Sequence, residues 1–187
     1  FALTGAADYS LTYNPGGIIV TLDANGNDST GNPIMVNPSA TTSYSIVSVT
    51  DANNCTNNTG SGSATITVNP LPDMQITGTT SICAGQSAII GCTPTGTAPF
   101  NLNYLVGGTP LSVTLDASGN DESTGNPVMA NPNTTTTYTL VDVTDANCTA
   151  SVIGSITITI NPLPTVTISG STSICDGQST DLDFNFT

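Results

Sequence analysis

The sequence predicts an all-β fold made of tandem β-sandwich repeats of about 92 residues, and two observations support this prediction. First, the chain repeats itself, because Asn69-Pro70-Leu71-Pro72 recurs 92 residues later as Asn161-Pro162-Leu163-Pro164. The segment Ile76–Ser87 recurs at the same distance as Ile168–Ser179. Second, short runs rich in Val, Ile, Thr, Tyr and Phe alternate with Gly, Pro, Asn and Ser, and none has helical periodicity.

The repeat divides the chain into three parts. Residues 73–164 make one complete unit. Residues 1–72 match only its later part, so we expect a unit that lacks its first strands, and residues 165–187 match its opening strands. A sandwich of about 90 residues buries a modest core, so a covalent staple would help to stabilise it.

The strands predicted in the complete unit are Met74–Thr77, Ser87–Cys92, Pro99–Val106, Leu111–Leu115, Thr135–Val143 and Ser151–Ile160. The last of them alternates, with Ile156, Ile158 and Ile160 on one face and Thr157 and Thr159 on the other. Six or seven short strands separated by turn residues are typical of an immunoglobulin-like sandwich.

The composition excludes many functions. The chain contains no Lys, Arg or His, and its 13 Asp and Glu residues give a net charge of −13. Such a surface repels nucleic acid, and no side-chain cation is present to bind a phosphate. Without His or Lys the common nucleophilic mechanisms are ruled out, so we predict that the chain is not an enzyme. A glycosidase-like pair of carboxylates is the catalytic arrangement that the composition leaves open. No apolar run approaches the roughly 18 residues of a membrane span.

Two motifs carry a resemblance to a known family. The complete unit and the segment 165–187 carry an opening Ser-Ile-Cys-x-Gly-Gln-Ser motif (Ser81–Ser87, Ser173–Ser179), and a late Val-Thr-Asp-Ala-Asn motif occurs at Val49–Asn53 and Val143–Asn147. Followed by a Thr/Ile/Val strand and Asn-Pro-Leu-Pro, these motifs resemble the tandem Ig-like (PKD-like) repeats of large secreted and surface proteins of Bacteroidota. The resemblance implies a β-sandwich, an extracellular or cell-surface location and a structural or adhesive role.

The cysteines occupy defined places in the repeat. Cys83 lies in the opening motif and Cys148 follows the late motif of the same unit, so we expect an intrachain disulfide between them. Cys55 follows the late motif of the first unit and Cys175 lies in an opening motif, so we expect these two to pair between chains. Zinc is disfavoured because His and CxxC spacing are both absent, and reduced thiols are the alternative. Cys92 takes the place of a Phe in the other copies and is interpreted as a buried apolar residue.

Two loops in equivalent positions concentrate oxygen ligands. They contain Asp23, Asn25, Asn27 and Asp28 in the first unit and Asp116, Asn120, Asp121 and Glu122 in the second. Oxygen atoms at every second residue are typical of Ca²⁺ loops, so these residues are candidate Ca²⁺ ligands and Ca²⁺ is the candidate cofactor. The alternative is a hairpin turn at Asn25-Gly26 and at Ser118-Gly119.

Covalent glycans are a further expectation, because the chain is rich in hydroxyl and amide side chains. The candidate sites are Asn27, Ser29, Asn54, Asn57, Asn133, Asn147 and Asn185. The two prolines of each Asn-Pro-Leu-Pro segment favour an extended, semi-rigid linker between units.

Three functions remain after these exclusions. The first is a structural subunit of an extracellular bacterial fibre or surface stalk. The second is an adhesin or a glycan-binding repeat module of a large secreted surface protein, which the absence of Trp disfavours. The third is an accessory domain of a secreted enzyme.

The incomplete unit predicts how a fibre would form. A sandwich without its first strands exposes apolar side chains and unpaired strand edges. Residues 165–187 carry the parts that residues 1–72 lack, so we expect them to complete the 1–72 unit of a neighbouring copy, head to tail. The alternative is that the 187 residues are a window on a longer tandem-repeat polypeptide.

Overall fold

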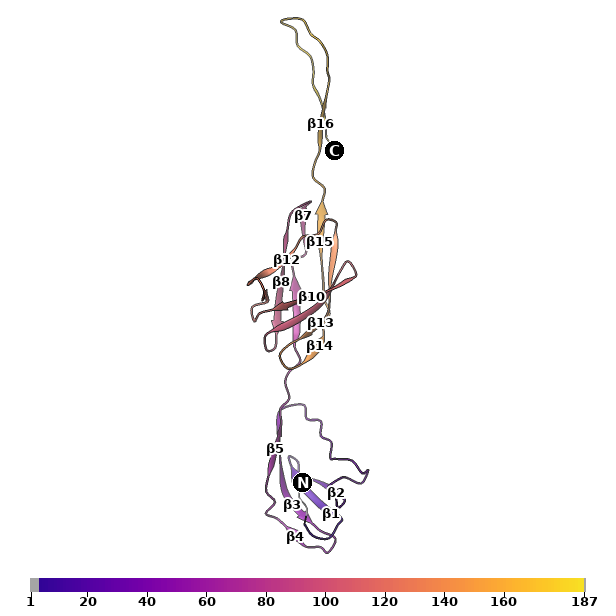
Figure 1. The fold of residues 1–187 in the computed structure, drawn as a ribbon, viewed down its shortest axis with the longest axis vertical. Helices are drawn as coiled ribbons and strands as arrows, with labels where there is room; N and C mark the ends of the chain where they lie inside the picture. The colour runs from indigo at the N-terminus through magenta and orange to yellow at the C-terminus, as the bar shows by residue number, and fades with distance from the viewer. Residues whose placement is uncertain (1–3, 187) are drawn as a thin grey trace. The chain divides into compact units, whose positions relative to one another are not determined.

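The computed structural model describes residues 4–186, which form strands, turns and loops and contain no helix (Figure 1). Residues 1–3 and 187, which belong to the first and third predicted parts, lie outside the described residues. The chain divides into two compact units, Phe1–Pro70 and Leu71–Thr187, so the division falls two residues before the predicted one. The all-β prediction is confirmed. No helix long and apolar enough to cross a membrane occurs among residues 4–186.

Unit 2 contains a β-sandwich. Its strands are Asp73–Thr77 (β6), Thr80–Cys83 (β7), Ala88–Thr95 (β8), Phe100–Val106 (β9), Thr109–Leu115 (β10), Asn120–Asp121 (β11), Asn126–Ala130 (β12), Thr136–Thr144 (β13), Thr149–Ser151 (β14) and Ser155–Asn161 (β15). They pair in the order β6-β8-β12-β11-β10-β9-β13-β15-β7, with β14 beside β13. One layer is β6-β8-β12 and the other runs from β10 to β7, and side chains of both groups of strands pack into one core.

The core of unit 2 lies between these layers. Met74 and Ile90 from the first layer meet Leu102, Leu140 and Ile158 from the second, and all five are 6% exposed or less. The alternation predicted in β15 agrees with the burial, since Ile156 and Ile158 are buried and the Thr residues between and after them are not. Apolar residues at every second position therefore place one face of each strand in the core.

Unit 1 contains a single sheet within residues 4–70. Its strands are Tyr9–Asn14 (β1), Ile18–Leu22 (β2), Thr42–Thr50 (β3), Thr56–Asn57 (β4) and Ser63–Ile66 (β5). They pair in the order β2-β1-β3-β4, with β5 also beside β3. The same connections occur in the second layer of unit 2, where β9 pairs with β10 and β13, and β13 pairs with β14 and β15. Unit 1 therefore has the counterpart of one layer of the sandwich in unit 2.

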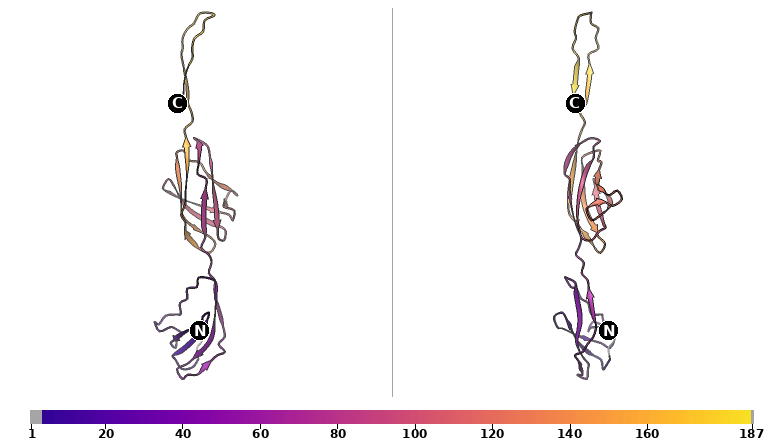
Figure 2. Two further views of the ribbon diagram at one scale, coloured as in Figure 1. Left: turned by 180° about the vertical axis from the view of Figure 1, so that it is seen from behind. Right: turned by 90° about the vertical axis from the view of Figure 1, so that its left-hand side faces the viewer.

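Residues 165–186 form a separate hairpin. Val166–Ser169 (β16) pairs antiparallel with Asp183–Phe186 (β17), and together they make a two-stranded sheet of their own (Figure 2). Its apolar side chains are exposed, with Ile168 at 60% and Phe186 at 73%.

Candidate functional site

The unit 1 sheet and its loops line a large cleft that contains both apolar and polar side chains. Its volume is about 1050 Å³, and its apolar lining includes Leu11, Tyr13, Ile34, Tyr44, Ile46 and Ile66. A small core of Tyr9, Leu11 and Leu22 covers one part of the sheet, and Ile34 and Ile46, which are only partly buried, pack against it. A cleft of this size is large enough to accept several side chains.

The corresponding place in unit 2 is filled. Tyr104 lies opposite Leu140 in the β9–β13 ladder, as Tyr13 lies opposite Ile46 in the β1–β3 ladder, so the two pairs are equivalent. Beside Tyr104 and Leu140 the remaining space is only about 10 Å³.

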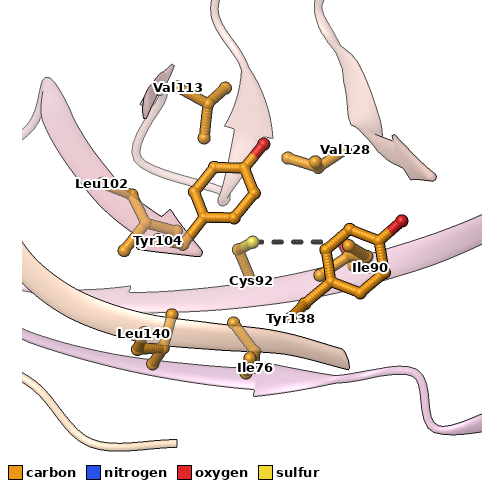
Figure 3. Close-up of a pocket in the computed structure, with 9 residues that line it drawn as sticks. All are labelled: Ile76, Ile90, Cys92, Leu102, Tyr104, Val113, Val128, Tyr138 and Leu140. Carbon is orange, nitrogen blue, oxygen red and sulfur yellow. Dashed lines mark hydrogen bonds between the residues drawn. The ribbon is translucent and has the colours of Figure 1, made fainter. Parts of the chain in front are cut away.

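Three side chains from β6 and β8 fill this space together with Val128 from β12. They are Ile76 from β6 and Ile90 and Cys92 from β8, and Figure 3 shows them beside Tyr104, Tyr138 and Leu140. Cys92 is 8% exposed, so its interpretation as a buried apolar residue is confirmed, and burial raises the pKa of its thiol to about 11.

Two strand pairings that occur in unit 2 have no counterpart in unit 1. In unit 2, β12 pairs with β8, with Val128 opposite Ile90. The unit 1 counterpart of β12, residues 32–36, is not a strand, and Met35 in it is 85% exposed. β15 likewise pairs with β7, and Ile158 is 0% exposed, whereas its counterpart Ile66 in β5 is 40% exposed.

The β16–β17 hairpin has the register of the strands that fill unit 2. Ile76 lies opposite Cys92 in the β6–β8 ladder, and Ile168 lies opposite Phe184 in the β16–β17 ladder, each 92 residues further along. Leu182 is the counterpart of Ile90 at the same distance. Ile168, Leu182 and Phe184 are 60%, 57% and 57% exposed, so the three residues equivalent to the filling side chains are in solvent.

In each candidate Ca²⁺ loop, an aspartate accepts hydrogen bonds from backbone N–H groups of the same loop. Asp23 accepts hydrogen bonds at Oδ1 from the N–H groups of Asn25 (2.8 Å) and Asn27 (2.9 Å). Asp116 does the same for Ser118 (2.8 Å) and Asn120 (2.9 Å). These are Asx turns, which use the carboxylate to hold a hairpin loop in shape.

The next aspartate in each loop makes the same kind of turn. Asp28 accepts from the N–H of Thr30 (2.8 Å) and Asp121 from the N–H of Ser123 (2.9 Å), while Glu122 donates its N–H to the carbonyl of Thr114. Residues 4–186 hold no group of three or more carboxylates or thiols that could ligate an ion. Calcium binding stays a prediction, and the structure gives these carboxylates a role as turn caps.

Two further aspartates tie together loops at one end of each unit. Asp145, 7% exposed, accepts at Oδ2 from the N–H of Thr97 (2.9 Å) and at Oδ1 from the N–H groups of Asn147 (2.8 Å) and Cys148 (2.7 Å). These bonds lower the pKa of Asp145, and that of Thr97 has the largest effect.

Asp51 holds the same position in unit 1. It accepts at Oδ1 from the N–H groups of Asn53 (2.9 Å) and Cys55 (3.0 Å), and the bond from Cys55 lowers its pKa most. In the sequence, the late Val-Thr-Asp-Ala-Asn motif is recognisable as a marker of the repeat. An Asp two residues before an Asn, as in this motif, is typical of a carboxylate that accepts a backbone N–H hydrogen bond in a turn, and this signal could have revealed the role of Asp51.

The predicted Cys83–Cys148 disulfide is incompatible with this fold. Cys83 ends β7 opposite Asn161, at the end of the sandwich where β13 begins. Cys148 follows the other end of β13, and its carbonyl accepts from the N–H of Asp145 (2.9 Å). The nine residues of β13 span about 26 Å at roughly 3.3 Å per residue, whereas a disulfide needs Cα atoms within about 7 Å.

The candidate glycosylation sites lie mostly on the surface. Six of the seven are exposed, namely Ser29, Asn54, Asn57, Asn133, Asn147 and Asn185, while Asn27 is half-buried. Attachment of sugars at these positions stays a prediction.

Comparison with known proteins adds a likeness in structure alone. No family model matches it, and no curated protein does. A solved structure, a Ca²⁺-stabilised adhesin with which an Antarctic bacterium reaches out and binds ice, is 19% identical with a TM-score of 0.40. The similarity covers 91% of this chain and 46% of that one, so the chain spans less than half the length of the adhesin. At this level of similarity neither fold nor function is transferred.

Proposed function

We propose that the chain is a structural subunit of an extracellular bacterial fibre or surface stalk, built from Ig-like units that are completed between copies. In this assembly the segment 165–187 of one copy enters the unit 1 cleft of the next. The supporting observation is the difference between two equivalent places in one chain. The cleft of unit 1 has a volume of about 1050 Å³, whereas only about 10 Å³ remains empty at the equivalent place in unit 2. The side chains that would fill the open one are exposed on a hairpin of the matching register.

Unit 2 supplies the template for this contact. Because Ile90 lies opposite Val128, we expect Leu182 opposite Ile34 of the neighbour. The segment 172–175 corresponds to β7 and would pair in parallel with β5, as β7 does with β15. Both open edges of unit 1 would then be paired, and residues 32–36 would become a strand.

The hydrophobic effect favours the contact. Full burial of an apolar side chain of this size is worth about 2 kcal/mol, and Ile168, Leu182 and Phe184 are each more than half exposed. The hairpin already holds the register it would have in the assembly, which reduces the entropy lost on docking. The net charge of −13 opposes association, so it should need physiological ionic strength or more.

A head-to-tail contact of this kind propagates. The segment that fills a cleft and the cleft that receives it lie on different parts of the chain, so each copy can bind one neighbour at either end. The prolines of each linker favour an extended conformation of the linker itself. The resemblance to Bacteroidota surface repeats supports an extracellular or cell-surface location, and the absence of His, Lys and Arg supports a non-catalytic role.

A second candidate is a glycan-binding adhesin module, and the cleft is the observation that favours it. Its lining combines Tyr13 and Tyr44, whose ring centroids are 6.1 Å apart, with the polar side chains of Asn25 and Asn57. Aromatic side chains combined with a few polar groups are typical of small-ligand sites. Binding of a glycan by the unassembled chain would favour this function, whereas occupation of the cleft by a second copy would exclude it.

The experiment is self-association of the full chain, measured by sedimentation and electron microscopy in 0.15 M salt or more. We expect filaments from the wild type and monomers from Phe184→Asp, which places a carboxylate on the face that enters the cleft. Thr167→Asp is the matched control, because its counterpart Gln75 is exposed in unit 2, and it should still assemble. Monomeric wild type at every concentration, or assembly of Phe184→Asp, would exclude the fibre.

A further inference from the structure

Phe184 is the largest difference between the segment that would fill unit 1 and the strands that fill unit 2. Most residues that line the filled space in unit 2 have counterparts that are identical, isomeric or larger by one methylene, such as Ile46 for Leu140 and Ile34 for Val128. Phe184, in contrast, is the counterpart of Cys92 and carries a phenyl ring in place of the sulfur atom. A completed unit 1 must therefore hold one more aromatic ring than unit 2.

Unit 2 has no space for that ring. Only about 10 Å³ remains empty beside Cys92, and Tyr138 lines the same space (Figure 3). Tyr138 also lies opposite Ile156 in the β13–β15 ladder, and facing side chains of an antiparallel pair are in contact. Tyr138 and Ile156 are 6% and 5% exposed, so the tyrosine ring cannot move away from Cys92 without displacing Ile156.

Unit 1 has space at the equivalent place. Tyr44 lies opposite Ala64 in the β3–β5 ladder, as Tyr138 lies opposite Ile156 in unit 2. Both Tyr44 and Ala64 line the cleft, and Ala64 is exposed. Because Ala lacks the outer carbon atoms of Ile, the ring of Tyr44 can lean over Ala64 and leave space for a second ring on its other side.

We propose that Phe184 makes residues 165–187 specific for unit 1, where its ring lies beside Tyr44 in the space that Ala64 leaves. This inference rests on the proposed function. A core accepts a larger side chain when a smaller one nearby keeps the total volume the same. The pair Phe184 and Ala64 in the joint between copies thus corresponds to the pair Cys92 and Ile156 in unit 2.

The same pair keeps the segment out of unit 2. If residues 165–187 displaced β6 and β8 of another copy, Phe184 would have to fit against Tyr138 and Ile156, where about 10 Å³ is empty. Overpacking of this kind is destabilising. Copies therefore join through the cleft of unit 1 and do not exchange strands between their complete sandwiches.

The first part of the experiment lies wholly within unit 2 and needs no assembly. Cys92→Phe in the full chain should lower the urea midpoint of unit 2 because the ring is overpacked, and Ile156→Ala should lower it because a cavity forms. The double variant Cys92→Phe/Ile156→Ala should be more stable than Cys92→Phe alone, because the ring takes the space of Ile156. Additive losses would overturn the compensation between the two positions.

The second part measures assembly of the full chain under reducing conditions. Ala64→Ile should raise the concentration needed for filaments roughly tenfold or more, because Phe184 then meets the side chain that unit 2 has. Ala64→Ile/Phe184→Cys, which carries the pair found in unit 2, should recover most of that loss. Thr65→Ile is the matched control, because it places the same side chain on the opposite face of β5 and should assemble like the wild type.

Three outcomes keep this inference apart from the fibre itself. In the unassembled chain, Ala64→Ile should leave the urea midpoint of unit 1 unchanged, since Ala64 is exposed, so a loss of filaments does not come from misfolding. Unchanged assembly of Ala64→Ile, or a loss that Phe184→Cys does not relieve, would overturn the pairing and leave the fibre intact. A wild type that forms no filaments would overturn the fibre and this inference with it.

Discussion

Units 1 and 2 contain the same five-strand arrangement but differ in what covers it. In unit 2, β6 and β8 cover the sheet, and Leu140 and Ile158 are 6% and 0% exposed. In unit 1 no described strand covers the sheet, and Ile66, the counterpart of Ile158, is 40% exposed. The contrast shows that one layer of this sandwich can form its ladders without the other, although most of its core is then unfinished.

The difference also shows that strand pairing and core formation depend on different segments of the repeat. Strand pairing within the sheet depends on local hairpins and on β1, β3 and their counterparts β9, β13, which need no second layer. Core formation depends on side chains from segments that come earlier in the repeat. Under the proposed function, the segments of residues 165–187 supply these side chains to the uncovered sheet of another copy.

The largest effect is expected from an equivalent pair of substitutions in the two units. Ile158→Ala should lower the free energy of unfolding of unit 2 by about 3 kcal/mol, because a fully buried side chain leaves a cavity. Ile66→Ala in the unassembled chain should cost less than about 1 kcal/mol, because the side chain is already partly in solvent. Urea unfolding of the chain at low concentration measures both.

Assembly should remove that difference. In filaments, Ile66 becomes buried, so Ile66→Ala should then weaken association by roughly as much as Ile158→Ala destabilises unit 2, about 3 kcal/mol. Equal costs in the unassembled chain would mean that the cleft of unit 1 is already filled, and no change in association would mean that Ile66 is not part of the contact.

A smaller effect is expected from acid. The pKa values of Asp51 and Asp145 are lowered in the fold by the N–H groups that they accept, chiefly from Cys55 and Thr97 respectively. At low pH the unfolded chain therefore binds more protons than the folded one. The stabilisation is complete above the ordinary Asp pKa of about 3.9 and is lost as the pH falls through the lower folded values.

Asn substitutions in the two units test this dependence. Asp145→Asn should flatten the loss of unit 2 stability between pH 5 and 2, and Asp51→Asn should do the same for unit 1, as followed by urea midpoints at each pH. Asp183→Asn is the control, since Asp183 lies on the exposed hairpin. An unchanged slope in both Asn variants would show that these caps do not govern acid stability.

The smallest effect concerns calcium. Since Asp23 and Asp116 already bind backbone N–H groups at 2.8–2.9 Å, we expect the melting temperature to be the same in Ca²⁺ and in EDTA. Differential scanning calorimetry measures this. A higher melting temperature in Ca²⁺ that Asp23→Asn or Asp116→Asn abolishes would instead assign Ca²⁺ to these loops.

The sequence was informative about the strands and less so about the ends of the units. Alternation in Ile156–Ile160 and the Cys-for-Phe exchange at Cys92 predicted buried positions, because burial alone selects for apolar residues of the right period. The Cys83–Cys148 pairing was wrong because separation along the chain says nothing about which end of a strand a residue occupies. Parallel pairing of β7 with β15 places Cys83 beside Asn161, at the end of the sandwich where the chain leaves it. No sequence pattern indicates that pairing.

Hydrogen exchange of backbone amides shows whether residues 165–187 of one copy complete unit 1 of the next. In filaments of the wild type, we expect residues 32–36 of unit 1 and residues 172–175 to gain slow exchange, because each becomes a paired strand. In Phe184→Asp, and in the wild type diluted to monomers, both segments should exchange rapidly, while β9 and β13 stay protected throughout. Rapid exchange of residues 32–36 and 172–175 in intact filaments would contradict the account.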